Sequence, residues 1–183
     1  APVDQLVVLL LQRRGAGSQR EALVVVADLV LPDLDGALVV VTDDREEALQ
    51  HARACLAKPD GAVVVEEFLA GPEVSLFCLC DGTTVVPLCP AQDFKRVGDD
   101  DSGPNTGGMG AYSPLDWAPE GLVDDVVARV AQPVVDEMHR RGTPFAGVLY
   151  VGLAVTRRGP QVSGISARFG DPEAQGVHAR LLA

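Results

Sequence analysis

The sequence contains very little lysine and no long apolar run, and both absences narrow its possible functions. Lysine occurs only at Lys58 and Lys95 in 183 residues, and the formal net charge is -11. Proteins hold nucleic-acid backbones mainly through summed Lys and Arg charge, so this balance argues against nucleic acid as a partner. No apolar stretch approaches the roughly 18 to 20 uncharged residues of a transmembrane helix, so we expect no membrane span. Any bound polyphosphate must therefore be held locally, by few cations.

The four cysteines lack the paired spacing of a zinc site; they are Cys55, Cys78, Cys80 and Cys89. Cys78 and Cys80 alternate along a predicted strand, which points both thiols to one face. We interpret the four as reduced core or strand residues rather than metal ligands or disulfide partners, and therefore expect a cytoplasmic protein. The chain begins at Ala1 without a methionine or the basic start of a signal peptide, which suggests an excerpt from a longer chain.

The most informative stretch runs from Gln92 to Pro114 and is rich in glycine. Four glycines within eight residues surround a Pro-Asn-Thr triplet; they are Gly103, Gly107, Gly108 and Gly110. This composition is unusual inside a helix or strand and predicts a loop. Glycine lets backbone N–H groups approach an anion, and Asn105 and Thr106 add side-chain donors, so phosphate or carboxylate binding is one interpretation. A long acidic surface loop is the other.

Hydrophobic patterning predicts a chain that begins with strands and a helix. The β-branched runs Leu23–Ala27 and Ala37–Val41 predict two strands around a turn. Asp43 and Glu46 have the spacing of a capping box and should begin an amphipathic helix. A further strand should start at Val63 and end in adjacent acids.

The second half of the chain predicts a hairpin, a long helix and a core strand. Val74–Leu79 and Thr84–Leu88 flank an Asp-Gly turn signal and should pair as antiparallel strands. Residues 121–141 form an apolar stripe at helical spacing, with Pro133 expected to bend the helix. Residues 145–155 should form a core strand.

The glycine-rich stretch resembles the central signature of the glycinamide ribonucleotide synthetase family, the phosphoribosylamine-glycine ligases, which are ATP-grasp enzymes of purine synthesis. Two further motifs of that family stand at the expected distances, at Val65–Ser75 and at Arg168–Gln175. The resemblance runs from about Val39 to the C-terminus. It implies an α/β (α+β) ATP-grasp fold, with two lobes of mainly antiparallel sheet and a nucleotide cleft between them.

The same resemblance suggests a division of the chain. Residues 1–22 stay unassigned, residues 23–88 form the small lobe and residues 89–183 the large lobe. The N- and C-terminal domains of the family would be missing parts of the same polypeptide.

The resemblance also implies roles for individual residues. The nucleoside would be held by Glu66, Glu67, Phe68, Leu69 and Glu73, although two adjacent glutamates are also typical of a solvated strand edge. Glycine and the phosphosugar would be held by Asp93, Asn105, Thr106, Gly107, Gly108, Arg168, Asp171, Pro172 and Glu173. Catalysis would rest on Lys95 at the ATP phosphates, with Arg168 and Asp171. A surface lysine and a structural ion pair at Arg168 are the alternatives.

The sequence departs from the family at two sets of positions. The two lysines that clamp the ATP phosphates are replaced by Leu29 and by Ala37 within Gly36-Ala37-Leu38. The carboxylate and amide that hold Mg²⁺ (or Mn²⁺) are replaced by Gly164 and Ser166. Oxygen ligands are what these cations require, so we expect the metal ligands of the family to be lost here.

The implied reaction joins glycine to 5-phosphoribosylamine, with ATP cleaved to ADP and phosphate through a glycyl phosphate. Such catalysis depends on positioning and charge neutralisation. Two other interpretations follow from the departures. One is a catalytically impaired pseudoenzyme or regulatory module that keeps the binding cleft, and the other is a structural fragment of a longer synthetase.

Overall fold

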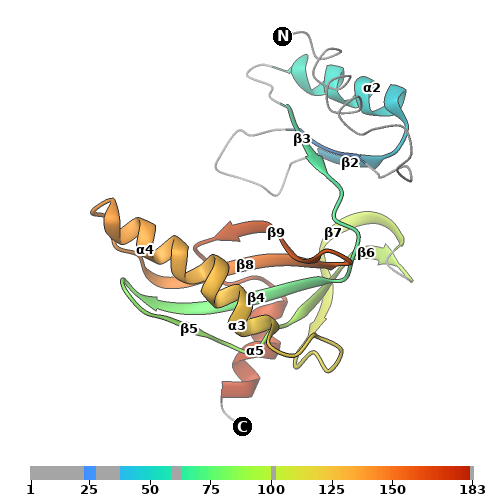
Figure 1. The fold of residues 1–183 in the computed structure, drawn as a ribbon. Helices are drawn as coiled ribbons and strands as arrows, with labels where there is room; N and C mark the ends of the chain where they lie inside the picture. Colours follow the sequence, from blue (N-terminus) through green and yellow to red (C-terminus); the bar gives the residue numbers. More distant parts are fainter. Residues whose placement is uncertain (1–22, 28–37, 59–62, 100–101, 182–183) are drawn as a thin grey trace. The chain divides into compact units, whose positions relative to one another are not determined.

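The computed structural model describes residues 23–27, 38–58, 63–99 and 102–181. The chain divides into two compact units between Phe68 and Leu69, and each unit is described here by itself (Figure 1). The predicted clamp positions Leu29, Gly36 and Ala37 lie outside the described residues, as does the segment 1–22. Among the helices in the described ranges, none is long and apolar enough to cross a bilayer.

The first unit contains a three-stranded antiparallel sheet and one helix. Its strands are β1 (Leu23–Ala27), β2 (Leu38–Thr42) and β3 (Val63–Glu67), in the order β2-β1-β3. The predicted bounds of β1 are confirmed, and β2 begins one residue later than predicted.

Helix α2 (Arg45–Leu56) begins at Asp44, one residue after the predicted cap. Asp44 Oδ1 accepts hydrogen bonds from the backbone N–H groups of Glu46 and Glu47 at 2.7 and 3.1 Å. The cap is therefore Asp44 and not Asp43, since Asp44 has the extended backbone of an N-cap residue and supplies the side-chain acceptor. The predicted apolar stripe is confirmed except at its end, since Leu56 is 40% exposed; its buried members are Ala48, Leu49, Ala52 and Cys55.

The second unit is built on a four-stranded antiparallel sheet with the order β5-β4-β8-β9. Its strands are β4 (Glu73–Asp81), β5 (Val85–Pro87), β8 (Ala146–Thr156) and β9 (Gly159–Ser166). The predicted hairpin is confirmed: Asp81 Oδ1 accepts from the backbone N–H groups of Thr83 and Thr84, and Gly82 has a φ of 99°. The sequence analysis places the lobe boundary after Leu88, but β4 pairs with β8 along its whole length and therefore belongs to this unit.

Both faces of this sheet are covered, by different elements (Figure 1). On one face, Val74, Leu76 and Cys78 pack with β8 residues under the long helix. On the other face, Phe77 packs with Val177 of α5 (Glu173–Leu181), a helix that the sequence analysis missed. Cys78 and Cys80 are both buried, so the prediction that they share a face is confirmed.

The long helix contains a π-helical turn. It consists of α3 (Leu122–Val126), the π segment η2 (Val127–Ala131) and α4 (Gln132–Arg140). The π turn ends two residues before Pro133, whose ring and missing N–H disfavour a regular α-helical turn in the residues preceding it. The fully buried positions follow steps of four, five and four residues; they are Leu122, Val126, Ala131 and Val135. Because the π turn takes up one extra residue, the buried positions after it come one residue later in the sequence than they would in a regular α-helix.

The glycine-rich stretch is a strand pair, so the prediction of a loop is wrong. Strand β6 (Gln92–Gly98) pairs antiparallel with β7 (Ser102–Tyr112), with register irregularities between Phe94 and Gly98. Extended pairing tolerates glycine when the partner strand supplies the backbone hydrogen bonds, and tertiary context here overrides local preference.

The π turn leads to a prediction about stability. Val135→Ala should lower the free energy of unfolding by about 2 kcal/mol, because the valine is fully buried. Val134→Ala is the matched control and should cost less than about 1 kcal/mol, because its side chain is only partly buried. Urea unfolding measures both. An equal or larger loss at Val134 would contradict the shifted stripe.

Candidate functional site

A polar cluster lies on the α5 side of the central sheet in the second unit. The backbones of Ser75 in β4 and Ala91 exchange two hydrogen bonds, of 2.8 and 2.9 Å. Continuing this antiparallel register sets Asp93 opposite Glu73. The alternation of β6 then puts Lys95 on the same face as Asp93.

Lys95 is paired within this cluster. Its Nζ donates to Glu73 Oε2 at 2.9 Å, and both side chains are partly exposed. Burial by itself would lower the pKa of Lys95, but the charge and hydrogen bond of Glu73 outweigh it and raise the pKa. Lys95 is therefore firmly protonated, and the two residues predicted to meet phosphate and ribose contact each other.

Asp93 is the most perturbed acid in the cluster. It is 7% exposed, and its Oδ1 is buried without a hydrogen-bond partner among the described residues. Burial, followed by repulsion from Glu173, raises its pKa from 3.8 to about 6, and the charge of Lys95 offsets only part of this. An unpaired buried acceptor beside a second acid is suited to a cationic or hydrogen-bond-donating ligand.

Glu173 is also buried, at 4% exposure. Its Oε1 accepts a hydrogen bond from Ser75 Oγ at 3.0 Å, and Ser75 Oγ lies 3.2 Å from the hydroxyl of Tyr150. The sequence analysis did not assign a role to Ser75 or Tyr150. The alternation of β4 could have indicated Ser75, since it shares a face with Glu73.

The residues predicted at the glycine-rich stretch are used mainly for structure. Thr106 Oγ1 donates to Lys95 O at 2.7 Å and accepts from Gly108 N at 3.2 Å, so its hydroxyl is already occupied. Gly108 has a φ of 127°, and a Cβ there would lie 2.7 Å from Pro172 Cδ. Asn105 lies in β7 opposite Arg96. A larger residue at Gly108 would destabilise the fold, so such a variant cannot separate binding from folding.

The C-terminal motif places one cation and one acid at the surface. Arg168 is exposed, and its Nη1 donates to Phe169 O at 3.1 Å. Asp171 is exposed and accepts from Gln175 Nε2 at 2.7 Å. Neither is in an ion pair that the structure records, so the alternative of a structural ion pair at Arg168 finds no support among the described residues.

The residues predicted to hold the nucleoside are divided between the two units. Glu66 is exposed, and Glu67 and Phe68 are partly buried, at the end of the first unit. Leu69 and Glu73 belong to the second unit. Their joint role as a nucleoside site stays a prediction.

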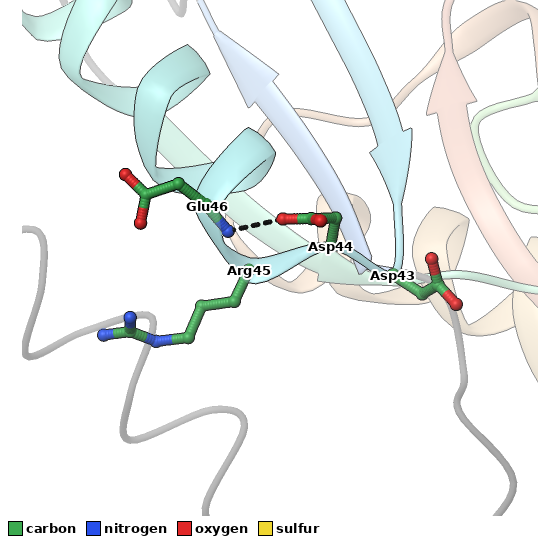
Figure 2. A pocket seen from close by; sticks show the side chains of 4 residues that line it. All are labelled: Asp43, Asp44, Arg45 and Glu46. Carbon is green, nitrogen blue, oxygen red and sulfur yellow. Dashed lines mark hydrogen bonds between the residues drawn. The ribbon is translucent and has the colours of Figure 1, made fainter.

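An open hollow lies at the start of α2, lined by Asp43, Asp44, Arg45 and Glu46 (Figure 2). Asp44 is turned to the backbone N–H of Glu46 as the helix cap, while Arg45 extends away from it. The hollow is thus a consequence of capping, and three carboxylates make it unsuitable for a phosphate.

The metal positions of the second departure lie on β9. Gly164 is exposed and pairs with Gly152, and Ser166 is partly buried and pairs with Tyr150. Neither offers a carboxylate, and in the part of the chain that the structure describes no group of three or more acidic, histidine or cysteine side chains is arranged to hold a metal ion. These residues do not fit the Mg²⁺ site expected from the family.

Known proteins resemble this chain over most of its length. Residues 16–174 match the family model described as phosphoribosylglycinamide synthetase, ATP-grasp (A) domain, which extends the resemblance upstream of Val39. The phosphoribosylamine-glycine ligase of Streptomyces coelicolor is 66% identical over 146 residues, covering 80% of this chain and 34% of the relative. That of Mycobacterium tuberculosis is 58% identical with the same coverage. The chain spans about a third of the length of these relatives.

Solved structures also resemble this chain in fold. The crystal structure of phosphoribosylamine-glycine ligase from Thermotoga maritima matches with a TM-score of 0.77 and 25% identity, covering 96% of this chain and 44% of that one. A carboxyaminoimidazole ribonucleotide synthase from Aspergillus clavatus, solved with ATP, matches with a TM-score of 0.56, 13% identity and coverage of 92% and 38%. The second likeness concerns the fold alone.

The acid cluster leads to a prediction about pH. The raised pKa of Asp93 means that its stabilising contribution is fully present below about pH 4 and is lost as the pH rises through about 6. The free energy of unfolding of the wild type should therefore fall relative to Asp93→Asn across this window, by at most about 3 kcal/mol. Urea unfolding of both proteins from pH 4 to 7 measures the difference. Parallel curves would contradict the perturbed acid.

Proposed function

Because the chain belongs to the phosphoribosylglycinamide synthetase ATP-grasp (A) domain family, we propose that it forms the ATP-grasp part of a ligase joining glycine to 5-phosphoribosylamine. ATP would be cleaved to ADP and phosphate, giving glycinamide ribonucleotide. The observation that carries this proposal is the polar cluster of Asp93, Lys95 and Glu173, whose member Glu173 belongs to the same motif as the exposed Arg168. This arrangement combines acceptors for an amine with donors for anions.

The substrates would divide between the two kinds of charge. Buried Asp93 and Glu173 would accept hydrogen bonds from the amino group of glycine, because an ammonium ion relieves their mutual repulsion. Arg168 presents a planar guanidinium that suits the carboxylate of glycine or a phosphate. Asp171 and Pro172 would complete the wall next to Gly108.

The nucleotide would use fewer cations than family members have. Lys95 is the lysine available to the phosphates in the second unit, and it would exchange its contact with Glu73 for a phosphate oxygen, leaving Glu73 for the ribose hydroxyls. Glu66, Glu67, Phe68 and Leu69 would hold the base. Each missing charge-assisted contact removes about 1.5 to 3 kcal/mol of binding.

A second candidate function is a substrate-binding module without catalysis. It is favoured by one observation, that β9 carries Gly164 and Ser166 where the family resemblance requires a carboxylate and an amide. Such a protein would keep the amine and anion contacts and bind nucleotide weakly. The two candidates differ in catalysis, because only a ligase would form glycinamide ribonucleotide from glycine, 5-phosphoribosylamine and ATP.

Arg168 tests the substrate assignment. Arg168→Ala should reduce the affinity for glycinamide ribonucleotide at least about tenfold, because a charge-assisted contact is lost. The melting temperature should hardly change, because the side chain is exposed and its recorded hydrogen bond among the described residues goes to the carbonyl of Phe169. Arg129→Ala, which removes an exposed ion pair with Asp125, is the control and should leave affinity unchanged. Calorimetric titration of both variants measures the effect, and equal losses would contradict the assignment.

The departures predict weak, magnesium-independent binding of ATP. Titration with ATP should give nearly the same affinity with and without Mg²⁺, since the chain lacks the family's metal ligands. A restored variant should bind ATP more tightly and only with Mg²⁺; its changes are Leu29→Lys, Ala37→Lys, Gly164→Glu and Ser166→Asn. A Cβ at Gly164 would meet nothing within 4 Å, so the backbone at this position accepts a side chain. Gly164→Glu alone should do little, because metal and phosphate are held jointly. Tight Mg²⁺-dependent binding by the wild type would overturn the prediction.

A further inference from the structure

Three side chains behind the acid pair form a directed chain of hydrogen bonds. Ser75 Oγ donates its single proton to Glu173 Oε1 at 3.0 Å. Ser75 Oγ is also 3.2 Å from Tyr150 OH, and since the serine proton is already used, the tyrosine must be the donor of this second bond. The sequence of donors is therefore Tyr150 to Ser75 to Glu173. Its direction presents protons toward the carboxylate.

The backbone leaves room for this chain at two glycines. Gly152 lies directly opposite Ser75 on β8, and a Cβ there would stand 3.1 Å from Tyr150 OH. A Cβ at Gly170 would stand 2.6 Å from Glu173 Oε2. A side chain at either glycine would therefore come too close to a residue of this hydrogen-bonded series.

The burial of two neighbouring acids destabilises the fold, which is expected of a functional site rather than of a structural one. Ser75 and Glu173 are both 4% exposed, and burying a carboxylate next to the 7% exposed Asp93 places two acids in a poorly solvated region. Asp93 Oδ1 keeps no partner among the described residues. The groups that face Asp93 are Glu173 from α5, Glu73 from β4 and Lys95 from its own strand.

We propose that Ser75, oriented by Tyr150, is a positioning residue that fixes the Glu173 carboxylate so that Glu173 and Asp93 together receive a primary ammonium group. This inference rests on the proposed function, because it assigns the amino group of the amino-acid substrate to this pair. Ser75 does not touch the ligand. Ser75 donates a hydrogen bond to Oε1 of Glu173 and thereby fixes the orientation of the carboxylate, whose other oxygen can accept from the ligand.

The titration of Asp93 tests the positioning role without any ligand. In Ser75→Ala the carboxylate of Glu173 is no longer held, so its repulsion weakens and the pKa of Asp93 should fall below its wild-type value of about 6. Gly170→Ala should have the same effect with little loss of stability, because the added methyl displaces only the flexible end of Glu173. Carbon-13 NMR of labelled aspartate measures the pKa. Tyr150→Phe should give a smaller shift, since Ser75 still donates to Glu173.

The control is Ser113→Ala, which also removes one serine hydroxyl, here bonded to the carbonyl of Pro90 at 2.8 Å and outside the acid pair. It should leave the pKa of Asp93 unchanged. An Asp93 titration that is the same in Ser75→Ala, Gly170→Ala and the wild type would overturn the positioning role, whether or not a ligand binds.

Binding of glycine and of acetate to the full chain then separates this inference from the proposed function. Acetate keeps the carboxylate and lacks the ammonium group. Wild type should prefer glycine, and Ser75→Ala should lose about tenfold in glycine affinity while acetate affinity is retained. Equal affinity of the wild type for the two ligands would overturn the proposed function. A wild-type preference that persists undiminished in Ser75→Ala would overturn the positioning role alone.

Discussion

The middle of strand β4, residues 74–78, is buried on both faces, and the second unit depends on this constraint. Its even-numbered residues from Val74 to Cys80 belong to the apolar core beneath the long helix. Its odd-numbered residues change along the strand from Glu73 and Ser75 to Phe77, so that one face is polar at its start and apolar further on. The polar end is stable because β8 and the Ala91 bridge satisfy its backbone. The candidate site is therefore a continuation of the core, fixed by the same pairing.

Regular alternation and helical spacing in the sequence predicted most strands and two of the helices, but missed α5 and the strand pair formed by β6 and β7. The hairpin at Asp81 and the strand Leu23–Ala27 were predictable because the turn residues and β-branched runs act locally. The strand β7 was not, since its extended conformation depends on pairing with β6 rather than on local preference. The predicted lobe boundary after Leu88 differs from the observed division of the chain for the same reason, because β4 pairs with the distant strand β8.

The sequence predicted some members of the polar cluster, but not Ser75, Tyr150 or the geometry of the cluster. Motifs identified Asp93, Lys95 and Glu173, but only the fold shows that Lys95 is already paired with Glu73 and that Asp93 Oδ1 is buried. The burial that perturbs Asp93 comes from α5 and β6 packing on one face, a property of tertiary structure. The clamp residues Leu29 and Ala37 lie outside the described part of the chain, so their role stays a prediction. So does the nucleotide cleft.

The π turn at Val127–Ala131 also limits how the length of this helix can change. Removing one residue there would restore a regular α-helical turn, and the buried positions would then follow steps of four throughout. Val135 would keep its place against the sheet, because the π turn is what takes up the extra residue. Elsewhere in the helix, a single-residue insertion or deletion would rotate everything beyond it by about 100° and carry the buried positions away from the sheet. Single-residue gaps between related sequences should therefore be placed at this turn rather than elsewhere in the helix.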